Sequence, residues 1–357
     1  AYMVRGEIYR HKDDFEAAVT DFERAIDLIP GNASVYHWFS FIMEAQGRHD
    51  EAHALLRRAH KLDPMSRVIH INYAMQPFHE GRHEEALAEL EKVKVLHPEY
   101  PAIYAYESWI NRQAGDPVGM LRAGLKVFEL DPKNNRTNSH CYNYISLDVE
   151  ESTLACIGNS KALKPIEKAF IRMLLHLVNG RRDMAQAVFD SSQDMEDIDG
   201  YRSDAALLVG EFEQSRAASE QEYPDWFSGP VANTVKYRQV DEMVDVALLL
   251  QRTGDPERAT QLLELALEAI SPHERNRGAQ AYGFLDVGIY ALLGQSEQAL
   301  AALEECADLE YLSGWQGLKF LPHYDSIRND PRFTAAVSRL NASAGRARKR
   351  AVSEGLL

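Results

Sequence analysis

Residues 6–30, GEIYRHKDDFEAAVTDFERAIDLIP, decide the fold because their landmarks recur at a fixed interval over residues 1–134. Prolines recur every 34 residues from Pro30 to Pro132, and several glycines and alanines recur at the same interval. The recurring positions are Pro30, Pro64, Pro98 and Pro132; Gly47, Gly81 and Gly115; Ala18, Ala52 and Ala86; and Ala25 and Ala59. A period of about 34 residues indicates a stacked repeat in which each unit is one pair of helices.

The residue types at these positions suit two antiparallel helices packed at close range. Small residues at Gly6 and Ala18 let the two helices approach, and Tyr9 and Phe22 fill the space between them. Pro30 closes the unit because proline cannot continue a helix. The later units carry equivalents, of which the last set is degenerate: Tyr36, Phe39, Ser40, Met43, Ala52, Leu56, Ala59 and Pro64; Tyr73, Ala74, Ala86, Leu90, Val93 and Pro98; and Tyr104, Ser108, Met120, Gly124, Val127 and Pro132.

The first unit resembles the tetratricopeptide repeat (TPR), whose pattern W-x2-L-G-x2-Y…A-x3-F…P it matches in its second half. The matching residues are Gly6, Tyr9, Ala18, Phe22, Ala25 and Pro30. The resemblance implies an all-α fold: an α-α superhelix, or TPR solenoid, of about eight or nine helix pairs. We expect this superhelix to be right-handed, with four regular pairs and the rest degenerate.

The regularity of the pattern divides the chain into five stretches. We expect four regular TPR units in residues 1–134, an irregular helical connector in 135–165, and degenerate TPR-like helix pairs in 166–310. A capping segment with a last helix follows in 311–340. The basic run at Arg346–Arg350 predicts a flexible tail in 341–357, since short charged C-terminal runs are usually solvated.

Composition excludes several classes of function. The 357 residues carry a net charge of −15, which disfavours direct contact with nucleic acid or with an anionic membrane surface. No run of 18 or more apolar residues predicts a membrane span. The three cysteines, Cys141, Cys156 and Cys306, are widely spaced and predict neither a metal site nor a disulfide framework. A reducing, cytoplasmic location fits this cysteine usage.

The two ends of the chain suggest a larger parent protein. Ala1 and Tyr2 already lie inside the first expected helix, so we expect a segment upstream. Residues 315–340 resemble the closing segment of bacterial TPR regulators, in which such an array follows a winged-helix, nucleotide cyclase or kinase domain. The residues that carry this resemblance are Leu321, Pro322, Tyr324, Asp325, Ile327, Arg328, Asp330, Pro331, Arg332, Phe333 and Leu340.

The inner face of the superhelix is the candidate binding surface, because the first helix of each pair lines it. Positions there recur with the period of the repeat, as in Glu7, Phe41, Met75 and Trp109. The candidate groove residues for a peptide or a partner protein are His37, Phe41, Ile71, Asn72, Met75, Tyr106, Trp109 and Arg112. Apolar and aromatic side chains in a groove suit an extended peptide or an amphipathic helix. The alternative is that they pack against the next repeat or against another segment of this chain.

Other kinds of site are disfavoured. The lysines and asparagines with which some TPR domains clamp a C-terminal carboxylate are missing from the inner positions. His49 and His53 have a spacing that can hold zinc, but no third ligand is evident, so we expect no metal. We find no nucleophile elbow, phosphate loop or dinucleotide turn, and expect neither a cofactor nor catalytic residues.

The sequence therefore predicts a non-catalytic scaffold for protein–protein interaction or sensing in bacterial signal transduction. Its groove would capture a peptide, a partner domain or a second copy of the chain in a homodimer. Two alternatives remain open: the regulatory region of a nucleotide cyclase, and that of a winged-helix transcription regulator. A large side chain at Gly81 should also disrupt the third unit by blocking a tight turn.

Overall fold

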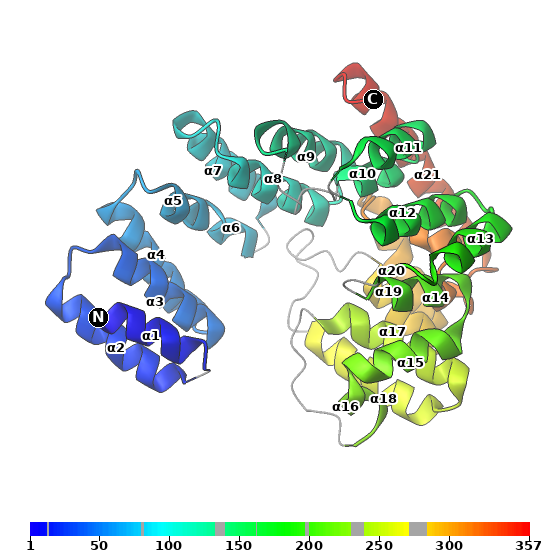
Figure 1. Ribbon diagram of the computed structural model, residues 1–357, viewed down its shortest axis with the longest axis horizontal. Coiled ribbons are helices and arrows are strands. Elements are labelled where there is room, and N and C mark those ends of the chain that lie inside the picture. Colours follow the sequence, from blue (N-terminus) through cyan, green and yellow to red (C-terminus); the bar gives the residue numbers. More distant parts are fainter. Residues whose placement is uncertain are drawn as a thin grey trace. The chain divides into compact units, whose positions relative to one another are not determined.

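The computed structural model is all-α, as predicted (Figure 1). It describes residues 1–12, 14–79, 82–132, 140–161, 163–196, 200–229, 239–270 and 284–357. The turn at Gly81 and the asparagine-rich stretch 134–138 lie outside these residues. In the described ranges, helices follow one another in pairs without any strand, as in an α-α superhelix. No described helix has the length and hydropathy that crossing a bilayer requires.

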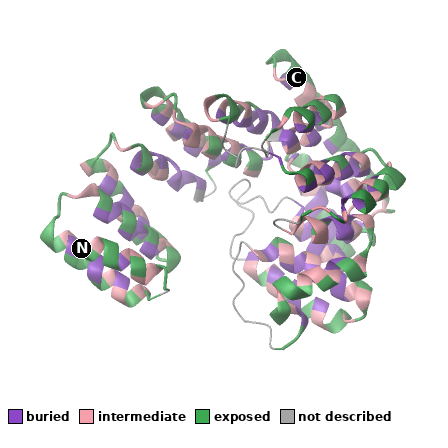
Figure 2. Ribbon diagram, in the orientation of Figure 1, coloured by how far each residue is buried: buried purple, intermediate pink, exposed green. Residues whose placement is uncertain are grey.

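The chain forms two compact units, which we call unit 1 (residues 1–103) and unit 2 (residues 104–357). Unit 1 holds the first three helix pairs. They comprise α1 (Tyr2–Arg10), α2 (Phe15–Leu28), α3 (Ala33–Ala45), α4 (His49–Leu62), α5 (Arg67–Ala74), α6 (Gln76–His79) and α7 (His83–Leu96). Figure 2 shows buried and exposed positions alternating along these helices, so each one has a face packed inward.

The first pair shows why the repeated residue types are needed. A Cβ atom on Gly6 would lie 2.7 Å from the ring of Phe22, so only glycine permits this helix spacing. Ala18 and Phe22 are fully buried, and Phe22 stacks on Phe39 of the next pair with ring centroids 5.6 Å apart. The small and large positions of the repeat therefore interlock both within one pair and between successive pairs.

Helix starts in unit 1 follow local capping rules. The Asp14 side chain accepts a hydrogen bond from the Ala17 amide at the start of α2, and Asn32 accepts one from Ser34 at the start of α3. Across the first pair, both side-chain oxygens of Asp21 accept hydrogen bonds from Arg5 at 2.6 Å. This bond lowers the pKa of the buried Asp21 carboxyl, which therefore stays charged and paired.

Unit 2 begins within α8 and holds the remaining pairs. Its helices are α8 (Pro101–Gln113), α9 (Pro117–Leu130), α10 (His140–Ser146), α11 (Glu150–Asn159), α12 (Pro165–Val178), α13 (Arg182–Ser192), α14 (Tyr201–Val209), α15 (Phe212–Glu222), α16 (Pro224–Phe227), α17 (Val240–Thr253), α18 (Pro256–Ile270), α19 (Leu285–Leu292), α20 (Ser296–Asp308), the 3-10 helices η3 (Trp315–Lys319) and η4 (Pro322–Tyr324), and α21 (Pro331–Ser353). Separate buried clusters hold α10–α14, α17–α18 and α19–α21 together.

The compact units divide within the fourth repeat rather than after residue 134. The cause is a set of contacts between this repeat and the end of the chain. The Leu312 amide donates to the Gly115 carbonyl at 3.3 Å, and Tyr311 lies against Gly115. Val118 and Leu121 of α9 share a buried cluster with Ala351 of α21. The fourth repeat thus packs with the C-terminal elements of unit 2.

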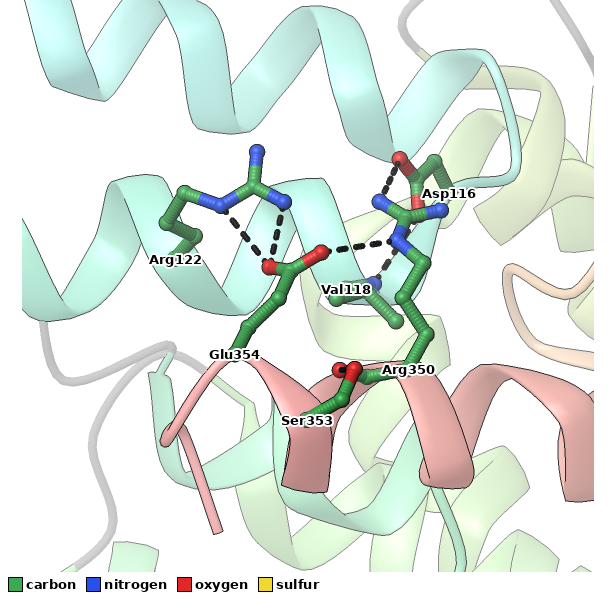
Figure 3. A network of polar contacts seen from close by, with 6 residues as sticks. All are labelled: Asp116, Val118, Arg122, Arg350, Ser353 and Glu354. Atoms are coloured by element: carbon green, nitrogen blue, oxygen red, sulfur yellow. Dashed lines mark hydrogen bonds and ion pairs between the residues drawn. The ribbon is translucent and has the colours of Figure 1, made fainter.

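Residues 341–353 are helical, so the prediction of a flexible tail there is wrong. They continue α21 and lie along α9, where Arg350 forms an ion pair with Asp116 at 2.8 Å and Glu354 accepts from Arg122 (Figure 3). Arg346 pairs with Glu310, and Arg348 with Asp148. The basic run is ordered because its arginines pair with acidic residues that lie much earlier in the sequence. The local composition of the run gives no sign of these partners.

A disulfide joins Cys141 of α10 to Cys156 of α11, which the spacing of the cysteines did not predict. The two Cα atoms lie 5.6 Å apart, and Cys306 is buried and takes no part in this bond. The 15-residue separation carried no recognisable motif. The pairing arises because α10 and α11 form a hairpin that brings the two positions together.

Candidate functional site

The predicted groove residues divide between the two units. His37, Phe41, Ile71, Asn72 and Met75 belong to unit 1, whereas Tyr106, Trp109 and Arg112 belong to unit 2.

In unit 1, the recurring position held by Glu7, Phe41 and Met75 is exposed at Phe41, an aromatic residue. Phe41 is 37% exposed, and Trp38, one turn earlier on α3, is equally exposed. Their ring centroids lie 6.1 Å apart in an edge-to-face arrangement, and His37 packs on Phe41 at 4.9 Å. We call Trp38 and Phe41 the aromatic patch. The sequence analysis missed Trp38, although it occupies the position in its repeat that the exposed Val4 occupies on α1.

The other predicted residues of unit 1 are less accessible. Ile71 and Met75 are 3% and 2% exposed, so their assignment as ligand contacts is wrong; the alternative of packing within the protein holds for them. His37 is also buried, and its Nε2 atom lies 2.6 Å from the Asn72 amide nitrogen. Burial lowers the pKa of His37, so the ring is neutral near pH 7 and can accept this hydrogen bond. His37 and Asn72 thus hold α3 against α5 behind the aromatic patch.

Unit 2 contains a cavity of about 660 Å³, which we call the inner cavity. Trp109 and Arg112 line it as predicted inner-face residues, while Tyr106 is absent from its wall and instead lies near Trp109. The described residues that line it are Ala105, Ser108, Trp109, Arg112, Met120, Gly124, Val127, Tyr142, Asn143, Ile145, Ser146, Phe170, Leu174, Val178, Leu208, Ser313, Gly314, Gln316, Gly317, Phe320 and Leu321. Helices α8, α9, α10, α12 and α14 supply most of these residues.

The segment 313–321 forms one wall of the inner cavity. Gln316 donates to the Ile145 carbonyl at 2.8 Å, and the Trp315 indole donates to the Ser146 carbonyl at 3.4 Å. Trp315 is fully buried. A distant segment of the chain therefore packs against the helices that line the inner cavity, while an accessible space remains beside it. Unit 2 thus has features of both alternatives, an open groove and a groove filled by the chain itself.

Most of the described residues that line the inner cavity are apolar, and one of them, Arg112, has a charged side chain. Arg112 is exposed and forms no ion pair within the described residues. Desolvation and the nearby Asp245 raise the pKa of Asp241, which is not among the lining residues. The positive charge of Arg112 has a smaller, opposite effect, so the pKa of Asp241 is raised overall. Burial also raises the pKa of Tyr142, whose hydroxyl is hydrogen-bonded to Tyr201 and stays protonated.

Sequence reasoning missed most of the inner cavity because its walls come from irregular stretches. Residues of α10 and α12 lie outside the regular repeat pattern, and the segment 313–321 was interpreted only as part of a cap. Asn143 is the clearest omission: it is buried in the lining, and its amide nitrogen has no hydrogen-bond partner in the described part of the chain. No group of three or more His, Cys, Asp or Glu residues within the described ranges has metal-binding geometry.

Comparison with known families places the repeat in unit 1. Residues 1–32 and residues 42–58 match models of the tetratricopeptide repeat. These matches cover the first helix pair, the end of α3 and most of α4. No curated protein sequence matches the chain significantly.

Several solved structures are similar in part. The Pseudomonas aeruginosa pilF structure has 15% identity and a TM-score of 0.45, over 57% of this chain and 94% of its own. Yeast Tom70 has 17% identity and a TM-score of 0.42, over 91% and 62%. Cut9, in the Cut9–Hcn1 hetero-tetramer of the APC/C, has 11% identity and a TM-score of 0.42, over 92% and 60%.

Proposed function

We propose that the protein is a non-catalytic interaction scaffold whose aromatic patch in unit 1 binds an apolar segment of a partner protein. The observation that carries this proposal is the exposure of Trp38 and Phe41 side by side on α3. Tryptophan and other aromatic residues supply much of the binding energy at protein interfaces, because each buries a large rigid surface at a small entropic cost.

The support behind the patch favours a preformed surface. His37 packs on Phe41 and is itself held by Asn72, so the ring of Phe41 has a fixed neighbour on its inner side. Phe39, on the same helix, is buried against Phe22. The helix that presents the patch is therefore anchored on its opposite face, and a partner would meet side chains that need little reordering.

The test is a double variant, Trp38→Ala with Phe41→Ala, in a site-specific cross-linking experiment. A photo-reactive phenylalanine analogue replaces Val4, and cross-linked partners from the source cells are identified by mass spectrometry with and without the double variant. We expect the double variant to lower the yield of the major cross-linked partner at least about tenfold, which corresponds to two interface residues of above-average energy.

The matched control is Met65→Ala with Val95→Ala. Both residues are large, apolar and more exposed than the patch, but neither lies on α3. We expect this control to keep the cross-link and both variants to keep the wild-type thermal midpoint. An equal loss of cross-link in the two double variants would contradict the proposal.

The partner could be a second copy of the chain. Light scattering on the purified protein tests this: a dimer in the wild type and a monomer in the double variant would identify self-association. The alternatives of a nucleotide cyclase or a winged-helix regulator as the parent protein depend on sequence beyond the chain and stay predictions.

A further inference from the structure

We propose that the inner cavity of unit 2 binds a small apolar monocarboxylate, with the carboxylate at Arg112 and the hydrocarbon body between α8, α10, α12 and the segment 313–321. This site lies in a different unit from the aromatic patch and does not depend on the scaffold function. It would make unit 2 a small-molecule binding unit.

The size of the inner cavity suits a small molecule. Its volume of about 660 Å³ falls within the range of roughly 300–1,000 Å³ typical of ligand sites. The wall 313–321 is held by hydrogen bonds to main-chain carbonyls of α10, so the space is bounded on that side by fixed structure. A folded partner domain would not fit such an enclosure, whereas a medium-chain hydrocarbon would.

The body of the ligand must be apolar. Large hydrocarbon side chains from three elements converge on the space, including Phe170 and Leu174 of α12, Leu208 of α14 and Phe320 of the wall. Several of the polar groups in the lining already have partners. Ser108 donates to the Met120 carbonyl, Gln316 to the Ile145 carbonyl, and Tyr142 is bonded to Tyr201. Most of the wall therefore offers a ligand hydrophobic contact rather than hydrogen bonds.

The head group must be an anion with hydrogen-bond acceptors. Arg112 is the only charged residue among the described residues of the lining, and a guanidinium is permanently charged and matches a carboxylate in geometry. Asn143 adds an amide nitrogen that lacks an acceptor in the described residues, and a buried donor without a partner costs stability. A carboxylate has two acceptor oxygens, which are what a guanidinium and an amide N–H both require. The positive charge of Arg112 in a largely apolar lining also disfavours cationic ligands.

The experiment is isothermal titration of the full chain with decanoate, and with decanol as the uncharged ligand of the same length. We expect saturable one-to-one binding of decanoate and at least tenfold weaker binding of decanol. Arg112→Gln should weaken decanoate binding about tenfold or more, as expected for the loss of a charge-assisted hydrogen bond. Arg172→Gln, which removes an exposed arginine of α12 outside the lining, should leave binding unchanged.

A second pair of variants tests the location without disturbing the core. Ala105 is exposed and lines the inner cavity, so Ala105→Trp should obstruct it and abolish binding. Ala217→Trp, at an exposed position of α15 outside the lining, should bind like the wild type. No saturable decanoate binding at millimolar concentration, equal binding of decanol, equal affinity of the two arginine variants, or equal affinity of the two tryptophan variants would each overturn the proposal. None of these results affects the aromatic patch.

Discussion

At the scale of single residues, the buried histidines of unit 1 couple its stability to pH. His83 is 7% exposed at the start of α7, stacks on Phe78 at 5.3 Å, and has an Nε2 atom without a partner in the described residues. Burial lowers its pKa to about 4. Burial also lowers the pKa of His70, and the charges of nearby His60 and His97 lower it further. These rings fold in the neutral form.

The sign of the pH dependence follows from these shifts. A histidine whose folded-state pKa lies below the usual value of about 6.5 stabilises the fold fully above pH 6.5, and this stabilisation is lost as the pH falls toward 4. We therefore expect the thermal midpoint of the chain to drop between pH 7.5 and pH 5. In His83→Gln the drop should be smaller, while His49→Gln, on the exposed surface of α4, should follow the wild type. Circular dichroism melts at both pH values measure this, and identical drops in the two variants would refute the role of His83.

At the scale of elements, the hairpin of α10 and α11 depends on a covalent link. The disulfide between Cys141 and Cys156 closes a loop of 15 residues, which in the chain-entropy model stabilises a protein by about 3 kcal/mol. Cys141→Ala with Cys156→Ala should lower the free energy of unfolding of unit 2 by about this amount. Chemical denaturation measures it, and thiol titration of the denatured wild type should find one free thiol before reduction and three after it. Three free thiols without reduction would contradict the disulfide.

The turn between α8 and α9 tests how the C-terminal segment docks. Gly115 has φ of +71°, and a Cβ atom there would lie 2.6 Å from Tyr311, whereas Gly294 has nearly the same φ and nothing within 4 Å. Both alanine variants bear a left-handed strain of about 1–2 kcal/mol. Gly115→Ala should cost about 1–3 kcal/mol more than Gly294→Ala, because Tyr311 must move. Equal losses of unfolding free energy in the two variants would show that Tyr311 does not pack on this turn.

At the scale of the whole molecule, unit 2 is closed by its last helix. Arg350 of α21 and Glu354 just after it form ion pairs with Asp116, the N-cap residue of α9, and with Arg122 (Figure 3). Ala351 shares a buried apolar cluster with Val118, Leu121 and Leu147. Exposed ion pairs contribute only about 0–1 kcal/mol each, so the apolar contact should dominate.

A truncation separates the two contributions. Deleting residues 347–357 should lower the unfolding midpoint of unit 2 by several degrees and speed amide hydrogen exchange in α9, while Arg350→Ala should change either quantity little. Exchange in unit 1 serves as the internal control, because the buried cluster that α21 shares with α9 lies within unit 2. A midpoint in the truncated chain equal to the wild type would refute the role of the last helix in closing unit 2.

The repeat period by itself determined the helix pairs of unit 1, since a small residue such as Gly6 and a large one such as Phe22 can interlock only if two helices pack at a fixed spacing. It also singled out Phe41, which is exposed, and Trp109 and Arg112, which line the inner cavity. The period could not separate Phe41 from Met75, which occupy equivalent positions but differ in exposure, because burial depends on what packs over each position. The inner cavity, the disulfide and the order of 341–353 were decided by the tertiary structure alone. Each depends on contacts of α9 or α10 with residues outside the regular repeat pattern, most of which lie far along the chain. The local sequence gives no signal for such tertiary contacts.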